Sequence, residues 1–328
     1  MSRNAANINT CVWEDWLSAQ RAVIPPLLDV KILSPRVIRI LGGNPGPFQL
    51  QGTNTYLVGM GEKRILPERR FRPTSLKPYA DVSQGKKSWI DNLVGVLGKH
   101  HLSISHVLLT HWHGDHTGGV PDLLSSDNAV SVSEDDVYKN SPDAGQQPIH
   151  DGQVFSVPGA TLRAVHTPGH AEDHCCFVLD EENALFTGDN VLGHGYSVEE
   201  DLAAYMESLG RMRDCNCTIG YPAHGDVIMD LPKTIRLYIR HIEARESLIT
   251  RALKKTGSEG RGQGGTVAPL SRGRTVADLV FELHGNLPEE IMKMALLPAV
   301  GRILEKLAQD KKVGFRIAWG VKHWFLMM

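Results

Sequence analysis

Apolar residues in the first two thirds of the chain come in short β-branched runs that polar and glycine-rich segments separate. Residues 36–41 and 53–58 form two such runs, and 104–110 is a more continuous one that leads into a glycine-containing loop. Short β-branched runs are typical of strands, and a continuous apolar run is typical of a strand buried on both faces. Further strands are expected at 154–157, 161–165, 175–179 and 184–187. The pattern therefore predicts sheet structure through this part of the chain.

The last third changes to helical periodicity. From 231 to about 255 apolar residues recur at near-helical spacing, which predicts one long amphipathic helix. A glycine-rich segment follows, and its composition is typical of a flexible linker. Beyond it, helical patterns at 276–283 and 288–307 precede a hairpin pattern at 314–326. Helices followed by a hairpin indicate a small winged-helix-like module.

The 328 residues are enough for one large domain and a small appended one. The predicted organisation is a lead segment at 1–35, a catalytic domain at 36–255, a linker at 256–273 and a C-terminal module at 274–328. Within the catalytic domain, residues 66–85 are rich in proline and arginine and lack periodicity where a third strand is expected. We interpret this segment as a surface insertion or as a stretch wrongly included in the coding sequence.

Composition excludes several classes of protein. Hydrophobic residues make up 41% and charged residues 22%, which excludes wholesale disorder. A net charge of −2 gives no overall field to attract nucleic acid or an anionic membrane, so neither is expected as a partner. Glu14 and Asp15 stand where a secretory signal peptide would have its apolar segment. No apolar run reaches the ~18 residues that a membrane-spanning helix needs. We therefore expect a cytoplasmic protein.

Candidate metal ligands follow several of the predicted strands. The loop after 104–110 reads HWHGDH, and later loops read HTPGH, FTGDN and PAHG. Imidazole and carboxylate are the ligands that hold zinc with an open coordination position. The seven candidates are His111, His113, Asp115, His116, His170, Asp189 and His224. His166 and His174 flank one of these loops; they could support the ligands, but core packing is the better explanation for both.

These motifs, in this order and spacing, resemble the metallo-β-lactamase superfamily over 36–251. The resemblance implies an α+β fold in which two sheets pack between helices as an αββα sandwich. It also implies two zinc ions. His111, His113 and His170 would hold the first ion, Asp115, His116 and His224 the second, and Asp189 would bridge both.

A narrower resemblance extends over nearly the whole chain. LSPRVIRILG, QGTNTYLVG, VLLTHWHGDHTGGVPDLL, NSPDAGQQPI, FTGDNVLGHG and VKHWF resemble fungal atrochrysone carboxyl-ACP thioesterases. That family implies hydrolysis of a polyketide thioester carried on the acyl carrier protein domain of a non-reducing polyketide synthase. The product would be the free carboxylic acid, in anthraquinone- or xanthone-type biosynthesis. Asp115 would orient the attacking water and move its proton, and Asp81 is the counterpart of a family Asp-Thr-Gly turn.

The chemistry agrees with a thioester substrate, because a thiolate with a pKa near 8.5 leaves without a strong general acid. Three alternatives remain: an endoribonuclease of the same superfamily, a glyoxalase-type hydrolase of glutathione thioesters, and a non-catalytic scaffold that binds the synthase. The near-zero net charge argues against the nuclease. The missing signal peptide argues against a true β-lactamase.

The predicted long helix also carries basic residues that could meet an acidic carrier protein. They are Arg236, Arg240, Arg245, Lys254 and Lys255. For any one of them, an ordinary solvated helix face is the better explanation.

Overall fold

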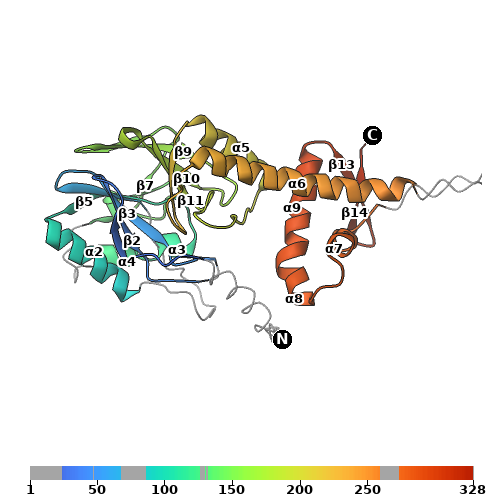
Figure 1. Cartoon of the computed structure of the whole chain (residues 1–328), viewed down its shortest axis with the longest axis horizontal. Helices are drawn as coiled ribbons and strands as arrows, with labels where there is room; N and C mark the ends of the chain where they lie inside the picture. Colours follow the sequence, from blue (N-terminus) through green and yellow to red (C-terminus); the bar gives the residue numbers. More distant parts are fainter. Residues whose placement is uncertain are drawn as a thin grey trace, which may run out of the picture. The chain divides into compact units, whose positions relative to one another are not determined.

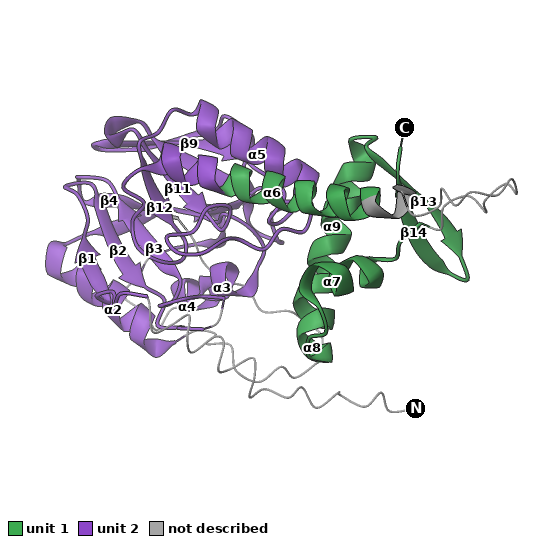
Figure 2. Cartoon of the chain, turned by 45° about the vertical axis from the view of Figure 1, so that its right-hand side comes forward, with its two compact units in different colours: residues 1–19, 238–328 green, residues 20–237 purple. Residues whose placement is uncertain are grey.

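The computed structural model describes residues 24–327, leaving out 47, 68–85, 126–129, 131 and 259–272. The described residues form two compact units, one over 24–237 and the other over 238–327 (Figure 2). None of the helices in the described ranges is long and apolar enough to cross a membrane.

The first unit begins with a seven-stranded sheet whose strands follow one another in chain order. Strands β1 to β4 are antiparallel to their neighbours, whereas β4 to β7 run parallel. The strands are β1 (Val30–Ile32), β2 (Val37–Leu41), β3 (Asn54–Val58), β4 (Lys63–Pro67), β5 (Ser103–Leu108), β6 (Val137–Lys139) and β7 (Gln147–Pro148).

Helix α2 (Lys87–His100) precedes β5 and lies against the outer face of this sheet (Figure 1). Its buried face includes Trp89, Leu93 and Leu97, which belong to one core cluster with apolar side chains of β2 to β5. Two short helices, α3 (Gly114–Thr117) and α4 (Val120–Leu124), follow β5.

The second sheet has five strands in the order β12, β11, β10, β9, β8. Its strands are β8 (Val154–Val157), β9 (Ala160–His166), β10 (Cys175–Leu179), β11 (Ala184–Gly188) and β12 (Ile219–Pro222). All neighbours are antiparallel except β11 and β12. Helix α5 (Leu202–Asp214) links those two parallel strands and lies on the outer side of this sheet (Figure 1).

A hydrophobic core lies between the two sheets. Tyr56 and Ile65 enter it from the first sheet, and Phe177, Phe186 and Tyr221 enter it from the second. The αββα sandwich that the sequence predicted is therefore confirmed.

Hydrogen bonds from β3 also fix the end of β12. Asn54 Nδ2 donates to Pro222 O at 2.8 Å and to Gly225 O at 2.7 Å, and Tyr56 Oη donates to Pro222 O at 2.6 Å. The backbone on both sides of His224 is thereby attached to the first sheet.

The segment with anomalous composition is described only in part. Leu66 and Pro67 end β4, and Leu66 is completely buried in the core beneath α2. These two residues are sheet rather than insertion. The rest of the segment, including Asp81, lies outside the described residues.

The second unit holds helices followed by a hairpin, in the order that the sequence predicted. Helix α6 (Leu231–Ser258) begins in the first unit and continues into the second. The elements that follow are α7 (Val276–His284), α8 (Glu289–Ile291), a π-helical turn (Met292–Leu296), α9 (Leu297–Gln309) and the antiparallel pair β13 (Val313–Ala318) and β14 (Val321–Leu326). The described residues leave out 259–272, so the predicted linker at 256–273 stays a prediction.

Candidate metal centre

Three histidines converge beyond the C-terminal end of β5. His111 and His113 belong to the loop that follows this strand, and His170 belongs to the loop between β9 and β10. His111 Nε2 lies 2.9 Å from His113 Nδ1 and 3.2 Å from His170 Nε2. His113 Nδ1 lies 2.9 Å from His170 Nε2. The first predicted ligand group is thus brought to one point.

A second group forms beside the first. Asp115 and His116 stand on the short helix α3, and His224 follows β12. Asp115 Oδ2 lies 3.3 Å from His224 Nε2 and 3.8 Å from His116 Nε2. These three side chains can offer their ligand atoms to one ion.

Asp189, at the end of β11, lies between the two groups. Its Oδ2 is 3.4 Å from His116 Nε2 and 3.5 Å from His170 Nε2, and its Oδ1 is 3.3 Å from His224 Nε2. The structure therefore brings all seven candidate residues together, with Asp189 in the bridging position. Their individual roles as ligands stay a prediction.

Burial and charge prepare these groups for a cation. Burial lowers the pKa of His111 well below its ordinary value and that of His170 to about 4, so both rings are neutral and can donate a lone pair to a metal. Burial acts to raise the pKa of Asp189, but the adjacent His224 and His116 outweigh it and keep this carboxyl ionised.

His224 shows the opposite balance. Burial acts to lower its pKa, but Asp189 and Asp115 outweigh burial and raise the pKa to about 10. The two carboxylates create a negative electrostatic potential that keeps a proton on the imidazole. A divalent metal ion can take the place of that proton.

The donor set fits zinc. A tetrahedral zinc ion with Zn–N bonds of about 2.0–2.1 Å holds its nitrogens about 3.3 Å apart. The three nitrogens of His111, His113 and His170 are separated by 2.9–3.2 Å, close to that spacing. Nitrogen and carboxylate oxygen ligands, without sulfur, also belong to the sets that zinc accepts.

Neighbouring groups orient the histidine rings. His170 Nδ1 lies 2.6 Å from the carbonyl oxygen of Val198, and His111 Nδ1 lies 3.0 Å from Thr110 Oγ1. A hydrogen bond at Nδ1 sets the tautomer and aims Nε2 at the ligand position.

Two contacts that support the predicted ligands or their loop had no signal in the sequence. Gln49, from the loop between β2 and β3, donates from Nε2 to Asp115 Oδ2 at 3.0 Å. Asp173 accepts a hydrogen bond from the Trp112 backbone N–H at 3.2 Å and so supports the loop that carries the first two histidines.

His174 is buried beside the cluster, and both interpretations given for it apply. Its Nε2 accepts a hydrogen bond from the Asp189 backbone N–H at 3.1 Å, and its Nδ1 lies 3.0 Å from Thr167 Oγ1. The other flanking histidine, His166, lies 3.2 Å from the Glu172 carbonyl oxygen through its Nε2.

Comparison with known proteins adds to this geometry. The family described as the metallo-beta-lactamase superfamily matches residues 83–224. The chain is 52% identical to "Lactamase-like protein nscB" of Neosartorya fischeri over 318 residues, covering 97% of this chain and 92% of that protein. It is 50% identical to "Atrochrysone carboxyl ACP thioesterase" of Aspergillus chevalieri over 319 residues, covering 97% of this chain and 96% of that protein.

Solved structures resemble the chain in fold. A beta-lactamase domain protein from Burkholderia ambifaria has a TM-score of 0.67 at 17% identity and covers 93% of this chain and 97% of its own. A metallo-beta-lactamase family protein from Thermus thermophilus has a TM-score of 0.60 at 20% identity and covers 90% of this chain and 100% of its own.

Proposed function

The chain belongs to the metallo-β-lactamase superfamily, and from that premise we propose that it is a metal-dependent thioesterase. Its substrate is an aromatic polyketide joined as a thioester to an acyl carrier protein, and its product is the free carboxylic acid. One observation carries the proposal: a complete set of seven convergent ligand residues, in a chain half identical to a protein named atrochrysone carboxyl ACP thioesterase. The carrier belongs to a non-reducing polyketide synthase of the anthraquinone or xanthone type.

The proposed centre holds two zinc ions. His111, His113 and His170 would hold one, Asp115, His116 and His224 the other, and Asp189 would bridge them. When bound, such ions lower the pKa of water toward neutrality and polarise a carbonyl, which supplies the nucleophile and the electrophile that hydrolysis needs.

Asp115 is the residue best placed to handle the proton of the attacking water. Burial acts to raise its pKa, but His116 and His224 outweigh it and lower the pKa below the ordinary value. The carboxylate is therefore ionised at neutral pH and can accept a hydrogen bond. The leaving thiol has a pKa near 8.5 and needs little protonation, so no further acid is required.

Exposed side chains in the segments that carry or contact the candidate ligands offer an apolar surface for an aromatic acyl group. Trp112 stands between His111 and His113 in sequence, is 51% exposed, and its ring lies 4.4 Å from that of His113. Val198, whose carbonyl oxygen contacts His170, is 51% exposed, and Tyr196 nearby in sequence is 50% exposed. Aromatic surface of this kind favours a flat, apolar substrate.

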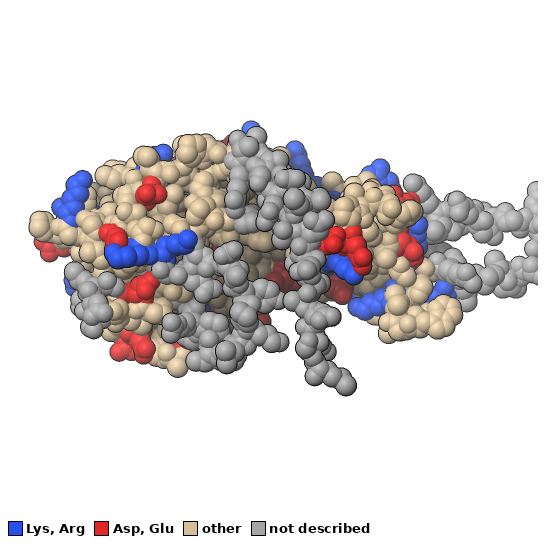
Figure 3. Space-filling view, turned by 90° about the horizontal axis from the view of Figure 1, so that it is seen from below, with Lys and Arg blue, Asp and Glu red and all other residues tan. Residues whose placement is uncertain are grey.

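The charge distribution on the one face drawn in Figure 3 favours a thioester over an RNA substrate. On the face shown in Figure 3, the described Lys and Arg side chains are scattered among Asp and Glu rather than gathered in one stripe. Phosphodiester binding depends on clustered basic side chains.

The test is hydrolysis by the zinc-loaded full-length protein. An aromatic polyketide on its acyl carrier protein, a glutathione thioester and an RNA are offered in parallel, with and without chelator. The proposal expects free acid from the first substrate only, and no acid once the metal is removed. Metal-dependent RNA cleavage without release of acid, or hydrolysis of the glutathione thioester alone, would overturn it.

A further inference from the structure

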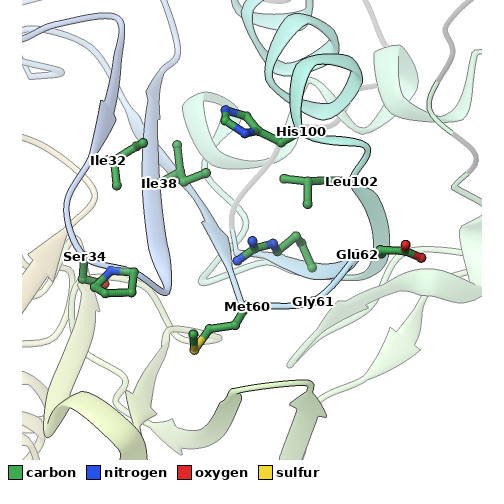
Figure 4. A pocket seen from close by; sticks show the side chains of 10 residues that line it. Ile32, Ser34, Ile38, Met60, Gly61, Glu62, His100 and Leu102 are labelled. Atoms are coloured by element: carbon green, nitrogen blue, oxygen red, sulfur yellow. The ribbon is translucent and has the colours of Figure 1, made fainter.

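A pocket of about 530 Å³ lies on the first sheet, away from the metal centre (Figure 4). Its apolar wall includes Ile32, Ile38 and Leu102. Ile38 belongs to the core cluster that also contains the buried face of α2, so the pocket lies on the side of the sheet that this helix covers.

The pocket and the metal centre lie at opposite ends of β5. Leu102 immediately precedes this strand, whereas the ligand loop that starts at His111 follows it. Six strand residues at about 3.3 Å each separate the two by roughly 20 Å. A small molecule in the pocket therefore cannot touch the metal ligands.

Arg64, at the start of β4, is the unusual lining residue. Arg64 is only 8% exposed, and its Nε and Nη1 are buried and have no hydrogen-bond partner among the described residues. Burial lowers the pKa of Arg64, yet a guanidinium keeps its charge at any physiological pH. A buried guanidinium with two unpartnered nitrogens is costly, and the negative charge of an anion bound beside it in the pocket offsets that cost.

Neighbouring acceptors do not serve this guanidinium. The carbonyl oxygens of Leu97 and Gly98, at the end of α2, accept from the backbone N–H groups of Leu102 and His101. Glu62 is exposed, and its carboxylate points away from the side chains of His100 and Leu102 (Figure 4).

We propose that this pocket binds a small organic monocarboxylate, with its carboxylate on Arg64 and its apolar body against Ile32, Ile38 and Leu102. The planar guanidinium matches a carboxylate in geometry and charge. Among the described residues that line the pocket, Arg64 is the one Lys or Arg, so these residues offer a polyphosphate no further basic side chain. The volume is in the range of sites for small molecules. The inference stands apart from the thioesterase proposal, because it uses none of the metal-centre residues.

The test is calorimetric titration of 2-naphthoate into the zinc-loaded full-length protein and its Arg64→Met variant. Any binding at the metal ions is the same in both proteins, so the difference reports on the pocket. We expect at least a tenfold weaker affinity in the variant, at least tenfold weaker binding of the neutral 2-naphthamide to the wild type, and unchanged thioester hydrolysis.

A second pair of variants keeps the test independent of the folding of Arg64→Met. Ile32 is 63% exposed at the pocket, and Leu28 is 67% exposed but is not one of the pocket residues. Ile32→Glu should weaken 2-naphthoate binding at least tenfold through charge repulsion, whereas Leu28→Glu should not. Equal affinity in wild type, Arg64→Met and Ile32→Glu would overturn the proposal, as would equal binding of the amide. Inorganic phosphate binding more tightly than 2-naphthoate would overturn the assigned ligand class.

Discussion

The two carboxylates of the metal centre differ in how their oxygens are used. Asp189 contacts imidazoles through both oxygens, Oδ1 toward His224 and Oδ2 toward His116 and His170. The contacts of Asp115 described above all use Oδ2. Its Oδ1 is therefore the oxygen suited to a transferable proton, whereas Asp189 is suited to a fixed bridging role.

Replacing Asp115 by asparagine tests that difference. Asp115→Asn keeps the shape of the side chain and removes its charge, so hydrolysis should fall by about 10²–10⁴-fold while carrier-protein binding stays within twofold. Rates on the carrier-bound thioester and calorimetric binding of the carrier protein measure the two effects. Asp91→Asn, on the exposed face of α2, is the control with no expected change. Parallel loss of hydrolysis and binding would contradict the assigned role.

Gly169 immediately precedes a predicted ligand and has no room for a side chain. Its φ is +131°, and a Cβ there would lie 2.3 Å from Tyr205 Cα. Gly169→Ala should therefore cost about 3 kcal/mol or more of unfolding free energy and lower the zinc content, as measured by urea unfolding and metal analysis.

Gly210 offers the matched control on α5. A Cβ there meets nothing within 4 Å, and the residue lies inside the helix, so Gly210→Ala should stabilise the protein by about 1 kcal/mol. If both substitutions gave the same loss, steric exclusion at Gly169 would not be the cause.

At this scale the sequence predicted which side chains converge better than it predicted the contacts that support them. The seven candidates stand in short motifs directly after strands, where local sequence is sufficient to find them. Gln49 reaches Asp115 across 66 residues of chain, and Asp173 reaches Trp112 across 61. Contacts of that separation depend on how the sheets pack, and no pattern in a single sequence encodes them.

Among the elements, α5 links the second sheet to the loop that holds His170. Its first turn is capped by Asp201, whose Oδ1 accepts from Ala203 N at 2.9 Å and Ala204 N at 3.1 Å. The backbone N–H of Asp201 also donates to the Gly169 carbonyl oxygen at 3.0 Å. The start of this helix therefore positions a ligand loop.

Asp201→Ala should lower the unfolding free energy by about 1–2 kcal/mol, because two backbone N–H groups lose their acceptor. Urea unfolding measures the change. Asp214→Ala, at the other end of α5, is the control and should stay within about 0.5 kcal/mol, because that residue caps nothing at the helix start. A loss of equal size in both variants would speak against capping as the cause.

Elements were predicted best where the pattern was long or strongly apolar. The strand at 175–179 has the predicted bounds, and those at 36–41, 53–58 and 104–110 agree with β2, β3 and β5 to within two residues. Strands β1, β6 and β7 are two or three residues long and carry too little pattern. Helix α2 was missed because Gly95 and Gly98 weaken its propensity, and packing of Trp89 and Leu93 stabilises it instead.

For the whole molecule, the metal centre joins both sheets. Four of the predicted ligands follow β5, two in the loop and two on α3, while His170, Asp189 and His224 come from the second sheet. Because all seven residues come together only in the folded state, bound metal stabilises that state by about 4 kcal/mol when free metal is about 1,000 times its dissociation constant.

Chelation should therefore lower the melting temperature by about 8–16 °C, as measured by scanning calorimetry with and without EDTA. Metal analysis before chelation should give two zinc ions per chain. A His111→Ala/His116→Ala double variant is the control, and chelator should leave its melting temperature unchanged. A wild type whose melting does not respond to chelator would contradict a structural contribution of the metal.

The attachment of β12 to β3 has a consequence for the order of events during folding. Its hydrogen bonds join residues 166–171 positions apart, whereas the His113 and His170 rings are only 57 apart. Pairings between distant residues form late, because closing a long loop loses entropy before any contact repays it. The three-histidine group can therefore be complete while His224 is still unplaced. If the proposed two ions bind, a nascent chain would then capture them one after the other, and the second capture would coincide with closure of the sandwich.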